Sequence, residues 1–157
     1  MKILLASVGK QHENYIQQGV SDFSARIGKH FSCDWCIIAP PKNAASLPEA
    51  ALKKAEAQLI LAQLQKDDFV VLLDERGKNI SSIDVANLLQ QQANKSTKRI
   101  VFLIGGAFGV DELITKRANF IWSLSKLVFP HMLVRLMLSE QVYRACTILK
   151  NEKYHHI

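Results

Sequence analysis

The 157-residue sequence predicts a single α/β domain built on a mostly parallel sheet that is flanked by helices. Short apolar segments alternate along the chain with longer segments of helical periodicity. Residues 100–104 read Ile-Val-Phe-Leu-Ile, and an uninterrupted apolar run of this kind is typical of a parallel strand that is covered on both faces. Glycines follow this run at once. Because ligands bind at the carboxyl edge of an open parallel sheet, we expect the functional site there.

The first half of the chain supplies two strands and two helices. Residues 2–9 predict a strand that ends in glycine, and residues 12–29 predict a helix because their apolar side chains recur every three or four residues. Residues 33–39 predict the second strand, which two prolines end. Residues 47–65 predict a long helix that begins after Ser46.

The second half repeats this alternation. Residues 69–73 predict the third strand, residues 83–93 a helix capped by a serine, and residues 99–104 the fourth strand. A short helix and a fifth strand from Phe120 follow the glycines. The last helix, about residues 132–150, is apolar around most of its circumference, so we expect a partner subunit to cover part of it.

The charges are unevenly distributed along the chain, whose net charge is +6. Residues 80–157 hold ten Lys or Arg and five Asp or Glu, so the excess lies in the half that carries the glycines. A basic surface near a ligand loop favours a polyanionic partner, of which RNA is the first candidate. The sequence has no 18-residue apolar span and no leader pattern, and we therefore expect a soluble, cytoplasmic protein.

Cys33 and Cys36 form a C-x-x-C pattern on an expected strand. Two residues three positions apart on a strand point to opposite faces of the sheet, which argues against joint metal or redox chemistry. No second cysteine pair is present to complete a zinc site, so we expect no metal. Packing is the favoured role, and a redox role stays open.

The glycine turn, Gly105-Gly106-Ala107-Phe108-Gly109, matches neither common nucleotide motif. Its spacing is not that of a dinucleotide-binding loop, and the Gly-Lys pairs elsewhere in the chain lack the other residues of a P-loop. Glycines let a backbone approach a ligand where a Cβ atom would collide. The turn alone is therefore compatible with a ligand loop or with a purely structural turn.

Six motifs in the second half occur in a fixed order and spacing. They are Leu73-Asp74-Glu75-x-Gly77-Lys78, Leu103-Ile104-Gly105-Gly106-x-x-Gly109, Ser123-Leu124-Ser125-Lys126-Leu127-x-Phe129-Pro130-His131, Leu133-Val134-Arg135, Glu140-Gln141-Val142-Tyr143-Arg144-Ala145 and Tyr154-His155. Together with the opening Lys2-Ile3 and Val8-Gly9-Lys10, they closely resemble the ribosomal RNA large subunit methyltransferase H (RlmH) family. These are small members of the SPOUT class, and the resemblance covers essentially the whole chain.

The resemblance implies a SPOUT fold with a C-terminal trefoil knot, a rare exception to the rule that protein chains are not knotted. It implies a cofactor-binding knot over about residues 100–150 and a tail, residues 151–157, that completes the active site of the other subunit of a homodimer. The implied reaction uses S-adenosyl-L-methionine to methylate N3 of a pseudouridine in helix 69 of 23S rRNA. The implied substrate is the assembled 70S ribosome.

Carried over position by position, the resemblance also implies the cofactor-binding residues. They are Leu73, Gly105, Leu124, Ser125, Lys126, Leu127, Val128 and Phe129. Adenine can be held by main-chain groups at strand ends within an apolar cleft, so variable side chains at positions 126–128 are compatible with this role.

Four further residues are candidates for catalysis. Tyr154 and His155 match the family in the tail, and His155 would act as a base or position the substrate, although terminal residues are often frayed. His131 either begins the last helix structurally or meets an anion there. Arg135 needs a partner in an apolar helix, either a phosphate, a cofactor carboxylate or Glu140. The spacing of Glu140 and Arg144 favours a surface ion pair.

Two other functions remain open at this point. The chain could be a ribosome-associated RNA-binding protein without catalytic activity, or a SPOUT methyltransferase that acts on tRNA. A binder has no need of a cofactor pocket, so the presence of such a pocket separates it from an enzyme.

Overall fold

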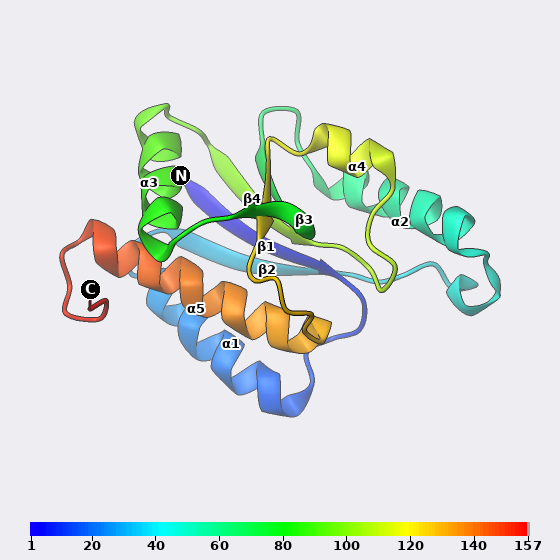
Figure 1. The fold of residues 1–157 in the computed structure, drawn as a ribbon, viewed down its shortest axis with the longest axis horizontal. Helices are drawn as coiled ribbons and strands as arrows, with labels where there is room; N and C mark the ends of the chain where they lie inside the picture. Colours follow the sequence, from blue (N-terminus) through cyan, green and yellow to red (C-terminus); the bar gives the residue numbers. More distant parts are fainter. Residues whose placement is uncertain (157) are drawn as a thin grey trace.

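The computed structural model describes residues 1–156, and these contain a five-stranded sheet whose neighbouring strands are all parallel (Figure 1). The strands are β1 (Lys2–Val8), β2 (Ser32–Ile38), β3 (Phe69–Asn79), β4 (Arg99–Ile104) and β5 (Phe120–Ser123), in the spatial order β2-β1-β4-β3-β5. The predicted α/β class with a parallel sheet is confirmed. Because all strands point the same way, the carboxyl ends of β3, β4 and β5 lie side by side at one edge.

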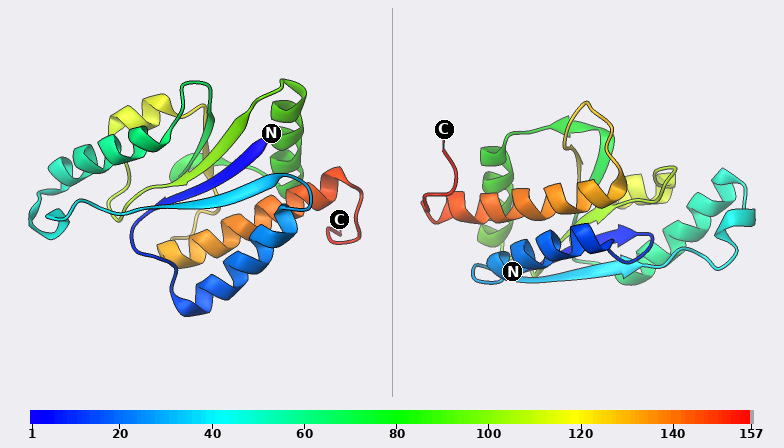
Figure 2. Two further views of the ribbon diagram at one scale, coloured as in Figure 1. Left: turned by 180° about the vertical axis from the view of Figure 1, so that it is seen from behind. Right: turned by 90° about the horizontal axis from the view of Figure 1, so that it is seen from below.

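Helices cover both faces of this sheet. They are α1 (Asn14–Ile27), α2 (Glu49–Gln63), α3 (Ser82–Asn94), α4 (Glu112–Arg117) and α5 (His131–Leu149), with a 3₁₀ turn at Ala44–Ser46. Figures 1 and 2 show α1, α3 and α5 together on one face and α2 with α4 on the other. Three layers result, with the sheet in the middle.

Successive side chains of a strand point to opposite faces of the sheet, so each strand contributes to both clusters of the core. In β1, Ile3 and Leu5 pack in the cluster beneath α1, α3 and α5, whereas Leu4 and Ala6 pack in the cluster beneath α2 and α4. β4 divides in the same way, and five of its residues are fully or almost fully buried. Two covered faces explain why residues 3–6 of β1 and residues 100–104 of β4 are uninterrupted apolar runs.

The cysteines obey the same alternation. Cys33 packs in the cluster beneath α1 and α5, whereas Cys36 packs on the other face and contacts Gln63 of α2. The expectation that the two sulfur atoms lie on opposite faces is confirmed. Burial raises the pKa of both Cys33 and Cys146 to about 12, so these two thiols stay protonated and inert at neutral pH.

The third strand is longer than the apolar run predicted. The run ends at Leu73, but β3 continues to Asn79 after an irregularity. Leu73 pairs with Trp122 of β5, and Lys78 then pairs with Trp122 again, so residues 74–77 bulge out of the ladder. This polar extension carries no apolar alternation, and its pairing depends on β5, which lies more than 40 residues further along the chain.

Within residues 1–156, no helix is long and apolar enough to cross a membrane.

The extension of β3 brings Gly77 against the backbone of β5. A Cβ atom at this position would lie 2.6 Å from the carbonyl oxygen of Ile121 and 2.8 Å from the nitrogen of Trp122. We expect Gly77→Ala to lower the free energy of unfolding by about 3 kcal/mol, because backbone atoms cannot move aside individually. Urea denaturation measures the change, with the exposed neighbour Lys78→Ala as a control. Equal stability of the two variants would show that β3 does not approach β5 this closely.

Candidate functional site

A cavity of about 550 Å³ opens where β3, β4 and β5 end. Its walls come from the end of β3, the glycine loop (residues 105–109), the segment that joins β5 to α5, and the first turns of α2. Of the eight residues that the sequence assigns to a cofactor, all but Lys126 line this cavity. They are Leu73, Gly105, Leu124, Ser125, Leu127, Val128 and Phe129. A cavity therefore lies at the carboxyl edge of the sheet, where the site was predicted.

The glycine loop is closed by its own backbone. The N–H of Gly109 donates to the carbonyl of Gly106 over 3.1 Å, and Gly109 has a φ of 84°, a conformation that favours glycine. A Cβ atom on Gly105 would lie 2.5 Å from Val110, and one on Gly106 would overlap the carboxylate of Glu56. The missing Cβ atoms thus make room for protein groups, whereas the sequence suggested that they make room for a ligand.

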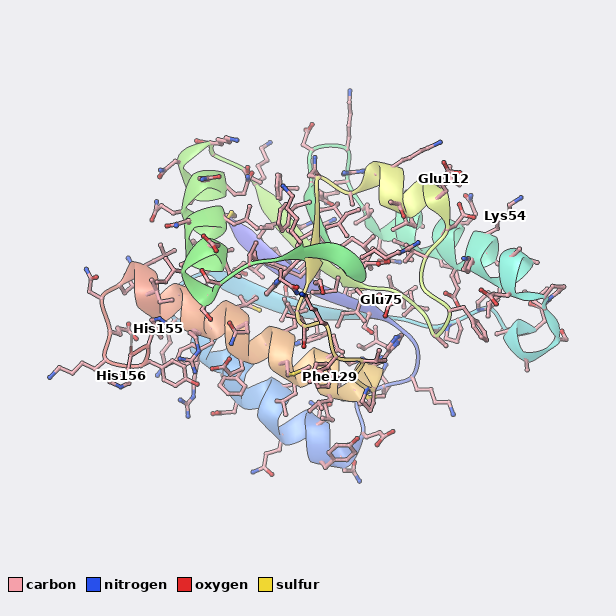
Figure 3. The ribbon with its side chains drawn as sticks, viewed as in Figure 1. Lys54, Glu75, Glu112, Phe129, His155 and His156 are labelled. Carbon is pink, nitrogen blue, oxygen red and sulfur yellow. The ribbon has the colours of Figure 1, made fainter. Side chains whose placement is uncertain are left out.

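The bulge of β3 forms a second wall. Asp74 accepts hydrogen bonds from the backbone N–H and from the Nε of Arg76, each over 2.9 Å. The guanidinium also lowers the pKa of the Asp74 carboxyl, chiefly through these bonds. Glu75 is exposed in the bulge, and Figure 3 shows it at the same end of the sheet as Phe129.

The segment between β5 and α5 is shaped by a chain of hydrogen bonds. Asn79 donates to the carbonyl of Ser123 over 2.9 Å, the hydroxyl of Ser123 donates to the carbonyl of Ser125, and the N–H of Leu127 donates to the hydroxyl of Ser125. These bonds hold the next two side chains outward. Leu127 and Val128 are 69% and 83% exposed, and both line the rim of the cavity.

Arg135 is almost completely buried, with 1% of its surface exposed. Its guanidinium donates to the hydroxyl of Ser7 over 3.1 Å and to the carbonyl of Lys10 over 2.8 Å, and it lies 3.3 Å from Nδ1 of His12. Glu140, one of the three partners that the sequence left open, does not bind Arg135, because it pairs with Arg144. The side chain instead ties the start of α5 to the loop after β1, and it does not line the cavity.

His131 is the first residue of α5 and lines the cavity. Burial lowers its pKa, and the positive charge of Arg135 lowers it further. The same two causes lower the pKa of His12. Burial, and to a smaller extent the guanidinium, therefore favours the neutral form of both imidazoles, one of which, His131, lines the cavity.

A second cluster of functional side chains lies at the other end of α5. Arg144 donates to Oε1 of Glu140 over 2.6 Å and 3.0 Å, and the hydroxyl of Tyr154 donates to the same oxygen over 3.0 Å. The guanidinium carbon of Arg144 lies 4.7 Å from the centre of the Tyr154 ring, and Nδ1 of His155 lies 3.4 Å from the guanidinium. The tail is docked on α5 rather than frayed, although Ile157 lies outside the described residues.

The predicted ion pair of Glu140 and Arg144 is confirmed, but it also anchors the tail. Tyr143 packs against Tyr154 and Phe23, as expected of a packing residue. Figure 3 shows His155 and His156 at the far end of α5 from Phe129. One chain therefore brings His131 to the cavity but leaves Tyr154 and His155 away from it.

Charged residues of α2 were missed by reasoning from the sequence. Glu49 and Lys53 line the cavity, and Glu56 lies directly against the glycine loop. Their spacing of four and three residues places them on one face of the helix, and this was the available signal. The cavity thus offers apolar side chains, backbone groups and charges of both signs. Across residues 1–156, no three His, Cys, Asp or Glu side chains gather into a group that could hold a metal ion.

Comparison with known proteins identifies close relatives over the whole chain. Residues 1–155 match the family model described as "Predicted SPOUT methyltransferase". The chain is 40% identical over 156 residues to the ribosomal RNA large subunit methyltransferase H of Cytophaga hutchinsonii, covering 99% of this chain and 100% of that one. It is 42% identical to the protein of the same name from Christiangramia forsetii and 38% identical to that from Clostridium botulinum, each over 99% of both chains.

Solved structures share the fold at much lower identity. A probable methyltransferase from Bordetella pertussis matches with a TM-score of 0.58 at 12% identity, covering 92% of this chain and 94% of that one. A probable methylase family protein from Haemophilus influenzae matches with a TM-score of 0.54 at 12% identity, covering 99% of this chain and 70% of that one. At this identity the likeness shows a shared fold.

The lowered pKa of His131 makes a prediction about stability. Below its ordinary value of 6.5, the unfolded chain binds a proton at this position before the folded protein does, so stability falls as the pH falls below that value. We expect His131→Asn to lose less free energy of unfolding than the wild type between a pH of about 7.5 and about 5. Urea denaturation at both pH values measures this, with the exposed His156→Asn as control. An equal loss in His131→Asn and wild type would contradict the assignment.

Proposed function

Because the chain belongs to the ribosomal RNA large subunit methyltransferase H family of SPOUT methyltransferases, we propose that it methylates N3 of a pseudouridine in helix 69 of 23S rRNA. The proposed substrate is the assembled 70S ribosome, which places the reaction in the cytoplasm. The observation that carries the proposal is the cavity at the sheet edge, where residues of four family motifs meet.

S-adenosylmethionine is the proposed methyl donor, and when bound it supplies an electrophilic methyl group on a sulfonium. The cavity suits it, because about 550 Å³ lies within the usual range of small-molecule sites. Leu73, Leu124 and Leu127 would surround the adenine, and free backbone groups at the strand ends would select it. Lys53 and Glu49 offer opposite charges for the carboxylate and ammonium groups of the donor.

The acceptor nitrogen must lose a proton before or during attack, since N3–H of pseudouridine is a weakly acidic imide. We assign this task to the tail cluster. The guanidinium of Arg144 lies 3.4 Å from Nδ1 of His155 and can hold the orientation of the ring. A neutral imidazole can accept or relay the proton, and the adjacent guanidinium stabilises an imide anion. Tyr154 would position the base.

A homodimer reconciles the two clusters. The tail cluster and the cavity lie at opposite ends of α5 in one chain, so we propose that the tail of one subunit reaches the cavity of its partner. The exposed apolar side chains at the cavity rim support this arrangement. They are Phe108, Leu127 and Val128, which are 57%, 69% and 83% exposed. Apolar groups this exposed are typical of protein interaction surfaces.

We further propose that the C-terminal half forms the trefoil knot implied by the family. The double pairing of β5 with β3, on either side of the bulge, supports a segment that passes close to an earlier loop. A crystal structure tests this, because a backbone trace that straightens when its ends are pulled apart is unknotted.

The first test of the function is methyl transfer from radiolabelled S-adenosylmethionine. We expect label at the helix 69 pseudouridine of 70S ribosomes that lack this modification, and little label on free 23S rRNA or on tRNA. Mapping of the labelled nucleotide checks the position. Label on tRNA would replace the proposed substrate, and cofactor binding without transfer to any RNA would contradict the proposed reaction.

A mixing experiment tests the shared active site. One variant lacks residues 154–157, and the other is Gly105→Val, whose side chain would displace Val110 beneath the loop. Each should be inactive alone. After the two are denatured and refolded together, about a quarter of wild-type activity should return, because half of the dimers are mixed and each holds one intact site. Activity that stays at the level of the separate variants would contradict the exchange of tails, provided that native mass spectrometry shows mixed dimers.

A further inference from the structure

Glu56 is the most deeply buried charged residue of α2, with 6% of its surface exposed. Its carboxylate lies directly against the glycine loop. A Cβ atom on Gly106 would lie 2.8 Å from Oε1 of Glu56 and would overlap Oε2. Gly106 lines the cavity and Glu56 does not, so the carboxylate contacts a wall of the cavity without facing its interior.

The carboxylate has no partner among residues 1–156, where no hydrogen bond or ion pair reaches it. Burial is the single cause that raises its pKa. Asp68 offers a contrast within the same protein, because it is 5% exposed yet accepts hydrogen bonds from Arg99 and from the N–H of Gln65. The Glu56 oxygen atoms keep a small contact with solvent, because they are not among the fully buried polar atoms that lack a partner. A carboxylate that is largely buried and has no such bonds is less favourable for folding than a paired one, and residues of this kind concentrate at functional sites.

The glycine loop holds backbone N–H groups that lie near this carboxylate. The glycine loop closes on itself through the N–H of Gly109, and the N–H groups of Ala107 and Phe108 make no hydrogen bond with described residues. Both belong to the tight turn that follows Gly106. A small shift of this turn would bring a loop N–H within reach of Glu56, since Gly106 already touches its carboxylate.

We propose that Glu56 is a positioning residue for the cofactor loop, which it holds in the ligand-binding conformation by accepting an N–H of that loop. The inference rests on the proposed function, because the ligand that the loop meets is S-adenosylmethionine or its product. Glu56 thus contributes to affinity through the loop and touches neither the ligand nor the RNA.

If Glu56 has this role, its replacement changes the affinity for the ligand and the stability of the protein in different ways. A residue that only supports the fold would lower both when it is replaced. Glu56→Gln removes a largely buried charge that no described cation balances, so this variant should be at least as stable as the wild type at neutral pH. Its affinity for the ligand should nevertheless fall, because a neutral amide is a weaker acceptor than a carboxylate.

The test is calorimetric titration with S-adenosylhomocysteine, together with the melting temperature of each unliganded variant. We expect Glu56→Ala to raise Kd by about tenfold or more, and Glu56→Gln to raise it less without lowering Tm. Glu112→Gln on α4 is the matched control, because this carboxylate is exposed and lies outside the cavity (Figure 3). The control should bind and melt as the wild type does.

A second pair of variants keeps the test valid if Glu56→Ala alone does not fold. Gly106→Ala should push the carboxylate of Glu56 away from the loop and lower the affinity, and Glu56→Ala in the same chain should not restore the affinity. Wild-type affinity in Glu56→Gln and in the double variant would overturn the inference. A fall in both the ligand affinity and the Tm of Glu56→Gln would also overturn it. Failure of the wild type itself to bind S-adenosylhomocysteine would instead overturn the proposed function on which the inference rests.

Discussion

The pairing of β5 with β3 is the constraint on which the candidate site depends. The chain leaves β4, passes through the glycine loop and α4, and adds β5 beyond β3 at the edge of the sheet. Two registers on either side of residues 74–77 hold it there, and Gly77 permits the close backbone approach. This arrangement places the ends of three strands around one cavity, with the bulge as one wall and the segment before α5 as another.

Three buried charged residues illustrate three ways of placing a charge inside a small domain. Asp68 is paired with Arg99, so its charge is balanced locally. Arg135 is surrounded by neutral acceptors, and its charge adds to the effect of burial in lowering the pKa of two neighbouring imidazoles. Glu56 has no hydrogen bond or ion pair among the described residues and lies beside the loop that is proposed to bind the cofactor. The first two arrangements hold elements together, whereas the third leaves a carboxylate without a balancing charge next to the proposed site.

Much of the fold could be predicted because apolar runs and helical periodicity are local properties. The strands, the helices, the opposite orientation of Cys33 and Cys36 and the position of the cavity all followed from them. Family membership and the identification as a methyltransferase, which rested on ordered motifs, are confirmed by the comparisons. The partner of Arg135 and the bulge of β3 could not be predicted, because each depends on contacts between segments far apart in the sequence. The contact between Glu56 and Gly106 escaped prediction for the same reason. The roles of the cofactor and tail residues stay predictions.

α5 follows all five strands in the sequence, so it is synthesised after the strands that it covers. This helix supplies Leu138, Val142 and Ala145 to the core cluster on one face of the sheet, and its Arg135 closes the loop after β1, near the start of the chain. An emerging chain that ends before α5 would leave open to solvent the part of that face that α5 covers, although α1 and α3 cover the rest. We therefore expect the nascent protein to expose apolar surface, and to be prone to aggregation, until α5 has left the exit tunnel.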